Sequence, residues 1–557
     1  MVPVGKESFM VAGLDFWPQI QPDVSEPRLE AALGKRGFLQ PPGGDDSPTI
    51  PTIRFPIWHS CPECHCLDVH WKLADPGSNR CRTCAIDLIP SRFVVACGLG
   101  HISDFPYMSW VHRGQEKSDA CKLTITTSGV SAALRDVVIS CTACDTARSL
   151  DGAFDAHEVN QVTRCWSNRP WLPNNKEADD CSESVRTLQR GASNVWFGEY
   201  RSALSIPPWS QAAFVAINPY WVVLRGIDDP VQLARAIEGA FGDSSPGVPL
   251  EKLVSAAQAR KAEETEPKPT DDASFRLEEY DALITGRPPT GDADEFVAVE
   301  TECPTLISDQ ISRVVLAHRL REVRVLTGFT RLNAAGADGG TGEEATASAS
   351  LSINDKDWLP AIEVRGEGIF LEFNKATLGK WEQQSEVKAR AAKLRDRYLN
   401  AIIQNRMPPG KAVSPRLILI HTFAHALIDA LSLDAGYPAA SLRERLFAAE
   451  EMCGVLIYTA TSDSAGSLGG IIAQGQTARI GKLVREAIQR YEWCSADPVC
   501  AESEAQGVDG MNLGACHACA LLPETSCEER NLFLDRAMLV GTAESPEIGF
   551  FASLLVN

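Results

Sequence analysis

The sequence is poor in positive charge for its length. It has 53 Lys and Arg against 73 Asp and Glu, a net charge of −20 over 557 residues. This balance excludes a protein that is basic over its whole surface, as histone-like proteins are. Local basic clusters are still allowed, because binding fields depend on local charge. The length predicts about three or four domains, since one domain usually takes roughly 100–200 residues.

Long hydrophobic runs are also missing. No uninterrupted apolar stretch reaches about 18 residues, the length that a membrane-spanning helix needs. The closest, residues 417–433, contains His421, His425 and Asp429 and is therefore predicted to be a buried core helix. The first twenty residues lack the charged start and apolar centre of a secretory signal. We expect a cytoplasmic protein with no membrane partner.

Motifs of NTP hydrolysis are absent as well. The sequence contains no G-x4-G-K-[ST] motif and no D-E-x-H box, and the nearest text, residues 475–483, has the wrong spacing. We therefore expect a protein that is not an enzyme and hydrolyses no NTP by itself.

One catalytic alternative is a metal-dependent nuclease or hydrolase. His421 and His425 have the spacing of a metalloprotease helix, but Thr422 stands where that helix needs Glu. Asp463 lies between Ser462 and Ser464 after a predicted strand, and strand ends often carry active sites. The alternative would use His421, His425 and Asp463, whereas two core histidines and a structural loop are the simpler interpretation.

Cysteine is scarce as a fraction but clustered along the chain. The 18 cysteines make up about 3% of the residues, too few for a disulfide scaffold, yet eleven of them fall within residues 57–185. In a reducing compartment, C-x2-C pairs indicate metal ligands rather than disulfides. The pattern predicts structural Zn²⁺, about three ions per chain, in closed four-thiolate shells.

Spacing sorts twelve of these cysteines into three predicted sites. Two C-x2-C pairs suit tetrahedral zinc because each turn presents two thiolates. The first predicted site is Cys61, Cys64, Cys81 and Cys84. The second is Cys141, Cys144, Cys165 and Cys181, and the third is Cys494, Cys500, Cys516 and Cys519.

Other residues compete for places in these sites. His65 and Cys66 directly follow the first C-x2-C pair. Spare candidates for the second site are Cys97, Cys121 and His157, although Cys97 and Cys121 also fit as buried strand cysteines. Cys527 competes for the third site, and His517 lies inside its C-x2-C pair.

The predicted fold class is mixed α/β and multidomain. We expect an N-terminal arm over residues 1–56, a zinc-ribbon-like region with two four-cysteine sites over 57–185, an α/β middle over 186–410, and a C-terminal α/β zinc-binding domain over 411–557. Residues 262–300 hold twelve acidic against three basic residues and are predicted to be a surface insertion. Residues 335–350 are predicted to be a flexible loop.

Periodicity predicts the main elements of the second half. Helices are expected over 312–332, 385–405, 416–433, 439–447 and 476–490, a strand over 454–460, and a β-hairpin over 358–373 that turns at Gly366. Strand-like and helical runs are expected over 220–224 and 231–241, and one helix over 27–35 in the arm.

Two predicted helices are rich in basic residues. Arg390, Lys393 and Arg397 share one face of the helix at 385–405, and Lys388 and Arg395 belong to the same helix. Arg321 and Arg324 belong to a second basic run. Such faces suit DNA phosphates, whereas solvated faces paired with Glu386 and Glu322 are the simpler alternative.

Several long motifs resemble a known family. The C-terminal text is similar to the zinc-binding domain of the MrfA helicase family, in HTFAHALIDALSLDAGYPAASLRERLF (421–447), GVLIYTATSDSAGSLGGI (454–471) and CHACALLPETSCEERNLFLDRAMLVG (516–541). The upstream text resembles the motor-less DrmB family of the DISARM anti-phage system, in RFPIWHSCPEC (54–64), ACGLGHISDFPYMSWVH (96–112), CTACDTARSLDGAF (141–154), RGASNVWF (190–197) and RLREVRVLTGFTRL (319–332).

The resemblance implies a partner role in phage defence. DrmB proteins pair with DrmA, a helicase of superfamily two, and the complex engages phage DNA. In the helicase relatives four cysteines bind metal, and the matching positions are Cys494, Cys500, Cys516 and Cys519. The resulting hypothesis is a non-catalytic, zinc-binding partner of the DrmA helicase that helps it bind DNA. A protein-only scaffold without nucleic-acid contact is its non-enzymatic rival.

Overall fold

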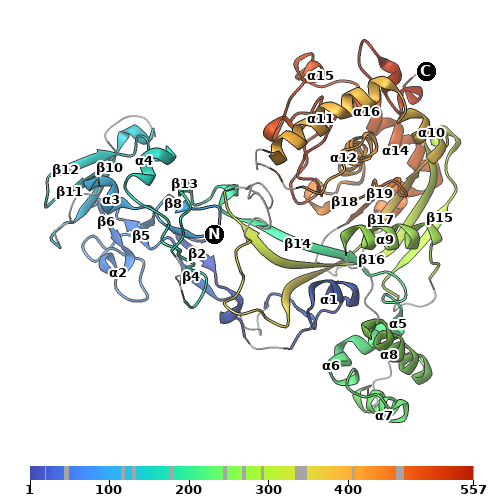
Figure 1. The fold of residues 1–557 in the computed structure, drawn as a ribbon, viewed down its shortest axis with the longest axis horizontal. Helices are drawn as coiled ribbons and strands as arrows, with labels where there is room; N and C mark the ends of the chain where they lie inside the picture. Colours follow the sequence, from blue (N-terminus) through green and yellow to red (C-terminus); the bar gives the residue numbers. More distant parts are fainter. Residues whose placement is uncertain are drawn as a thin grey trace.

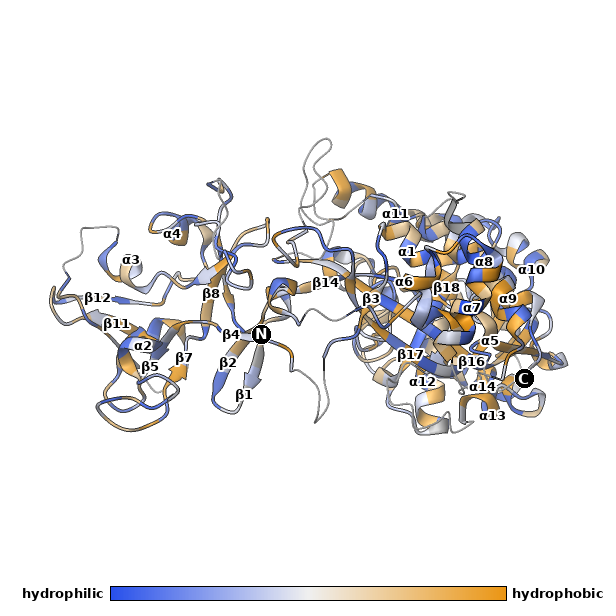
Figure 2. Cartoon of the chain, turned by 90° about the horizontal axis from the view of Figure 1, so that it is seen from below, coloured by the Kyte–Doolittle hydropathy of each residue, from blue (hydrophilic) through white to orange (hydrophobic). Residues whose placement is uncertain are grey.

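The computed structural model forms a small N-terminal lobe and a larger C-terminal lobe (Figure 1). It describes residues 1–18, 21–42, 49–113, 119–127, 133–174, 180–241, 247–265, 271–289, 294–332, 348–403, 407, 409–459 and 470–555. Figure 2 shows the same two lobes from a second side, with β5, β8 and β11 in one lobe and α9, α10 and α14 in the other. The predicted mixed α/β class is confirmed.

The described residues of the N-terminal lobe form three small sheets. Their strand orders are β1-β2-β4, β12-β11-β10-β6-β5-β7 and β13-β8-β9, and all their pairings are antiparallel. The strands are β1 (Val2–Val4), β2 (Glu7–Val11), β4 (Thr52–Arg54), β5 (Trp58–Ser60), β6 (Cys66–Val69), β7 (Ile89–Pro90), β8 (Phe93–Ala96), β9 (Ile102–Asp104), β10 (Leu123–Thr127), β11 (Val137–Cys141), β12 (Thr146–Ser149) and β13 (Arg186–Gln189). The short helices are α2 (His70–Leu73), α3 (Tyr107–His112) and α4 (Ala156–Asn160).

A seven-stranded sheet forms the centre of the larger lobe. Its order is β14-β16-β17-β19-β18, with β15 also paired to β16 and β3 paired in parallel to β17. The strands are β3 (Phe38–Leu39), β14 (Phe197–Leu204), β15 (Val297–Thr301), β16 (Ile311–Thr330), β17 (Leu359–Phe373), β18 (Leu442–Phe447) and β19 (Gly454–Thr459). Strand β3 directly follows α1 (Pro27–Leu33) in the sequence. Because β3 pairs with β17, part of the N-terminal segment belongs to the larger lobe.

Helices cover both faces of this sheet. One face packs against α12 (Pro415–Ala435), whose side chains meet those of β17 and β19 in the largest hydrophobic cluster. The other face packs against α9 (Asp272–Thr285), through Tyr280 and Leu283. The remaining helices are α5 (Ala212–Ile217), α6 (Trp221–Leu224), α7 (Pro230–Phe241), α8 (Leu250–Thr265), α10 (Lys375–Trp381), α11 (Ser385–Ile403), α13 (Gly470–Gly475), α14 (Thr477–Arg490), α15 (Val499–Glu502) and α16 (Ala537–Val540).

Helix α12 is long and apolar enough to cross a bilayer. In its most apolar window, however, 78% is buried inside the protein. Ser414 begins the helix by accepting a hydrogen bond from the Leu417 amide, and Gly436 ends it in the left-handed region at φ 72°. Helix α12 is therefore a core helix of the larger lobe, as the sequence predicts.

The helix predicted over 312–332 is instead the 20-residue strand β16. Both faces of this strand are covered. Val314 and Leu316 face the α12 side, while Val315 and Ala317 face the α9 side. A strand buried on both faces loses the alternation of apolar and polar residues, so its hydrophobic pattern can resemble that of a helix.

The hairpin predicted over 358–373 is also a single strand, β17. Gly366, expected at a turn, continues the strand and pairs with Leu320 of β16. A side chain there would overlap the Oγ1 and carbonyl atoms of Thr459. The glycine is thus required for close strand packing rather than for a turn.

Three smaller predictions are also wrong. Residues 439–447 form a short 3-10 turn followed by β18, and residues 221–224 form helix α6 instead of a strand. The acidic segment 262–300 is folded in part, since Phe275, Tyr280 and Phe296 are buried. Most of the loop predicted over 335–350, and the segment with Ser462, Asp463 and Ser464, lie outside the described residues.

Candidate metal centres

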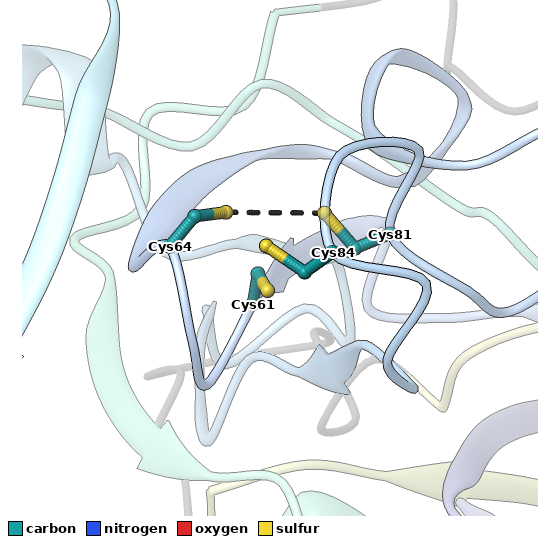
Figure 3. Close-up of side chains that lie close together, drawn as sticks. All are labelled: Cys61, Cys64, Cys81 and Cys84. Atoms are coloured by element: carbon teal, nitrogen blue, oxygen red, sulfur yellow. Dashed lines mark hydrogen bonds between the residues drawn. The ribbon is translucent and has the colours of Figure 1, made fainter.

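The first predicted zinc set is brought together in the N-terminal lobe, where its four side chains point toward one another (Figure 3). Cys61 and Cys64 lie between β5 and β6, while Cys81 and Cys84 lie between α2 and β7. Both pairs form the same tight turn, in which a residue with positive φ follows the second cysteine. His65 (φ 58°) donates its amide to Cys61 O at 3.0 Å, and Ala85 (φ 54°) donates to Cys81 O at 2.8 Å.

The sulfur geometry of this set fits one tetrahedral ion. Cys64 Sγ and Cys81 Sγ lie 3.8 Å apart, and the four sulfur atoms lie within 4.8 Å of one another. A zinc ion with Zn–S bonds of about 2.3 Å requires sulfur atoms about 3.8 Å apart. Apart from the cysteines, the local hydrophobic cluster holds only Leu73, Ala74 and Leu88. So small a core depends on a metal for its stability.

Backbone amides of the turns favour thiolates. Burial acts to raise the pKa of Cys81, but amide hydrogen bonds from Cys84 and Thr83, together with weaker ones from the neighbouring thiols, overcome it and lower the pKa to about 7. Burial likewise opposes ionisation of Cys141, and the amides of Ala143 and Cys144 lower its pKa to about 6. Thiolates are the form that binds metal.

The second predicted set is not brought together but divided between two clusters. Cys141 and Cys144 lie with His112 and Cys121, whereas Cys165 and Cys181 lie with Cys97 and His101. Each cluster therefore combines three thiols with one imidazole, a donor set that suits structural zinc. The grouping of Cys141 and Cys144 with Cys165 and Cys181 is corrected accordingly.

The sheet explains the first of these two clusters. Strand β10 pairs with β11 so that Leu123 faces Cys141, which brings Cys121 beside the Cys141 turn. Cys121 Sγ lies 3.3 Å from Cys144 Sγ and 3.6 Å from His112 Nε2. His112 Nδ1 lies 2.8 Å from Met108 O, so a proton on Nδ1 leaves Nε2 free to bind metal.

The second cluster lies where β8 turns into β9. Cys97 directly follows β8, and His101 directly precedes β9. His101 Nδ1 lies 3.4 Å from Cys97 Sγ and 3.5 Å from Cys165 Sγ. Cys181 Sγ completes the group at 4.0 Å from Cys97 Sγ.

The third predicted set is brought together in the larger lobe. Cys494 follows α14, Cys500 lies in α15, and Cys516 and Cys519 belong to the following loop. Sulfur separations are 3.6 Å for Cys494–Cys516 and 3.8 Å for both Cys500–Cys519 and Cys516–Cys519. These distances again match a tetrahedral four-thiolate shell.

The other competitors lie outside these four clusters. Cys66, His65, His157 and His517 belong to no candidate metal group among the described residues, and neither do Cys303 and Cys453, which had no place in any predicted site. Cys527 lies apart from the third set, beside His421 and His425.

Comparison with known proteins gives two family models and one long relative. Residues 1–197 match a family described as a domain of unknown function (DUF8724), and residues 423–520 match the MrfA Zn-binding domain. The chain is 33% identical to the DISARM protein DrmB of Bacillus paralicheniformis over 531 residues, which cover 91% of each chain. The chain belongs to the DrmB family. The first family model spans the three N-terminal clusters, and the second spans Cys494, Cys500, Cys516 and Cys519.

Zinc binding is thereby confirmed for this DrmB family member. The clusters are compatible with the predicted number of about three ions. Two of the three predicted four-cysteine sets are found as predicted. Two further clusters contain histidine and arise from the division of the second predicted set. Spacing could not reveal His101 and His112, because single histidines carry no local signature of ligation.

The predicted DNA-binding residues differ in their surroundings. Arg390 pairs with the buried Asp535, with Nη2 3.1 Å from Oδ1, and Arg397 Nη1 donates to Gly510 O at 3.1 Å. Arg321 is buried and ion-paired with Glu363, and Arg324 Nε lies 2.9 Å from Glu322 Oε2. The exposed members of the set are Lys388 and Lys393, the latter 2.8 Å from Glu504 Oε1.

The two histidines of the catalytic alternative are not accessible at the surface. His421 and His425 are fully buried in α12, and Asp463 lies outside the described part of the chain.

Proposed function

We propose that the protein is a non-catalytic, zinc-binding subunit of a cytoplasmic DISARM complex that pairs with the DrmA helicase and helps it bind phage DNA. The similarity to a DISARM protein DrmB over 91% of both chains carries this proposal. The name of that relative supports membership of a defence complex.

The form of the metal clusters supports a structural role for the zinc. Each of the four thiol-rich clusters offers four protein ligands. A catalytic zinc usually keeps one position open for water or substrate, whereas a four-ligand shell is closed. The clusters therefore suit the stabilisation of loop-rich modules, which a partner protein or a nucleic acid can contact.

The exposed side of α11 supports a contact with phosphates. Lys388 and Arg395 line an open depression of about 650 Å³ together with Ser414 and Pro415, at the start of α12. Glu382 also lines it, and its carboxylate is ion-paired with Arg416 Nε at 2.9 Å. A helix start carries partial positive charge, which adds to that of the two side chains. Lys393 does not line this depression, because it projects from another side of the helix, where it pairs with Glu504.

Copurification and DNA titration test the proposal. The full-length chain should copurify with its DrmA helicase, and adding it should tighten helicase binding to labelled DNA in an anisotropy titration. If the DNA affinity of the helicase is the same with and without this chain, the proposed DNA role is wrong.

Charge reversal on α11 locates the contact. We expect Lys388→Glu with Arg395→Glu, the two basic residues of this depression, to weaken DNA binding and to reduce the slope of log affinity against log salt by about two. Lys72→Glu with Lys482→Glu makes the same charge change at two exposed lysines elsewhere. Equal weakening by both pairs would show that general charge, rather than the α11 face, is responsible.

A further inference from the structure

A fifth group of metal-ligand side chains lies in the core of the larger lobe. It consists of His421 and His425 on α12, Glu444 on β18, and Cys527 in the segment after the C-terminal zinc loop. The two histidines and the glutamate are 0% exposed and Cys527 is 4% exposed. Buried polar side chains in such density need strong partners.

The four ligand atoms converge on one point. His421 Nε2 lies 3.1 Å from Cys527 Sγ and 3.3 Å from Glu444 Oε1. His425 Nε2 lies 3.7 Å from Glu444 Oε2, and one ligand atom from each residue falls within 4.8 Å of all the others. These separations suit a single tetrahedral ion with bonds of about 2.0–2.3 Å.

Neighbouring groups fix the orientation of the ligands. His425 Nδ1 lies 2.6 Å from Ala520 O, so its proton sits on Nδ1 and the lone pair of Nε2 points towards Glu444. Glu444 Oε1 accepts the Glu528 amide at 2.9 Å, and Cys527 Sγ accepts the Asn531 amide at 3.1 Å. Partners of this kind around the ligands are typical of metal sites.

Two lone-pair atoms are left facing each other. His425 Nε2 and Glu444 Oε2 are buried and have no hydrogen-bond partner. In the tautomer that Ala520 selects, both atoms are acceptors, and two facing acceptors repel unless a cation lies between them.

We propose that His421, His425, Glu444 and Cys527 bind a fifth metal ion, a divalent transition metal of the zinc class. The Glu444 carboxylate and the Cys527 thiolate balance the charge of a dication, and the two imidazoles complete the shell. The site is closed and structural. It ties α12 to β18 and to the chain just beyond Cys519, and so couples the core of the lobe to the neighbouring four-cysteine cluster.

Metal content of purified full-length protein tests the proposal. Elemental analysis should find one equivalent of metal less per chain in Cys527→Ser than in the parent protein. Cys453→Ser is the matched control, because Cys453 is also buried but belongs to no metal group among the described residues. It should keep the parent content. Equal content in Cys527→Ser and the parent protein would overturn the proposal.

Cadmium substitution gives a readout that needs no variant. In ¹¹³Cd NMR of the full-length chain grown with cadmium, the resonance position moves upfield as sulfur ligands are replaced by nitrogen and oxygen. The proposed site has one sulfur ligand and should give a resonance well upfield of the three- and four-sulfur clusters. A spectrum with only sulfur-rich resonances would refute the site. If Cys527→Ser fails to fold or loses more than one equivalent of metal, this spectrum is the deciding test.

Discussion

Arg445 and Glu279 form a doubly hydrogen-bonded ion pair inside the larger lobe. Arg445 Nε lies 2.6 Å from Glu279 Oε2, and Nη2 lies 2.7 Å from Oε1. The arginine is 1% exposed at its side chain and the glutamate 0%. The pair joins β18 to α9, so a helix within the acidic segment of the sequence is anchored to the central sheet.

Breaking this pair should cost more stability than removing a surface charge. Glu279→Ala leaves Arg445 buried without its main counter-charge, and we expect the free energy of unfolding to fall by about 3–5 kcal/mol. Asp281→Ala, at an exposed position of the same helix, should change it by less than about 0.5 kcal/mol. Thermal melts of both variants measure the difference, and equal melting temperatures would contradict the assigned role of the pair.

The two mixed clusters make a prediction about zinc content. Cys97→Ser should release about one zinc per chain, because Cys97 lies with His101, Cys165 and Cys181. Cys66→Ser should release none, although Cys66 lies next to the first C-x2-C pair. Elemental analysis of the purified variants checks both results, and full zinc retention by Cys97→Ser would contradict the regrouping.

Local patterns in the sequence predicted the parts of the fold that depend on near neighbours. The helices α11 and α12 were predictable from periodicity. Strands β16 and β17 were not, because their burial on both faces depends on α9 and α12, which are distant in sequence. Gly366 indicated a turn because the sequence does not show that Thr459 packs against it in the folded protein.

The same division holds for the metal centres. A C-x2-C pair contains its own turn, so Cys61, Cys81 and Cys141 could be assigned to metal turns from spacing alone. Which turns share an ion depends on strand pairing, such as that of Leu123 with Cys141. The cluster around His421 combines a helix, a strand and a loop, and no spacing rule links them.

Arg390 and Lys388 should behave differently despite sharing one helix. Arg390→Ala removes the partner of the buried Asp535 and should lower the free energy of unfolding by about 3–5 kcal/mol. Lys388→Ala should change it by less than about 0.5 kcal/mol, because Lys388 is exposed. Chemical unfolding of the two variants distinguishes a buried ion pair from an exposed lysine whose side chain is bonded only to Gln383 among the described residues. Comparable stability losses would argue against this assignment.

Asp104 predicts a pH-dependent term in stability. Burial raises the pKa of its carboxyl from 3.8 to about 6, although the Trp58 amide donates to it at 2.9 Å. The folded protein therefore holds this proton more tightly than the unfolded chain, and stability falls as pH rises from about 4 to about 6. Asp104→Asn removes this loss. The variant should match the parent near pH 4 and exceed it by at most about 3 kcal/mol above pH 7, as thermal melts across this range would show. A difference that does not change with pH would contradict the raised pKa.

Two glycines provide the last prediction. A Cβ atom at Gly366 would overlap Thr459 across the β17–β19 pair, whereas a Cβ at Gly379 in α10 would meet no atom within 4 Å. Gly366→Ala should therefore destabilise the protein by about 1–3 kcal/mol through overpacking. Gly379→Ala should stabilise it by about 0.5–1 kcal/mol, because alanine loses less backbone entropy in a helix. Because the two substitutions add the same methyl group, opposite shifts in melting temperature would separate close strand packing from helix propensity. Shifts of the same sign would contradict the position of Gly366 against Thr459.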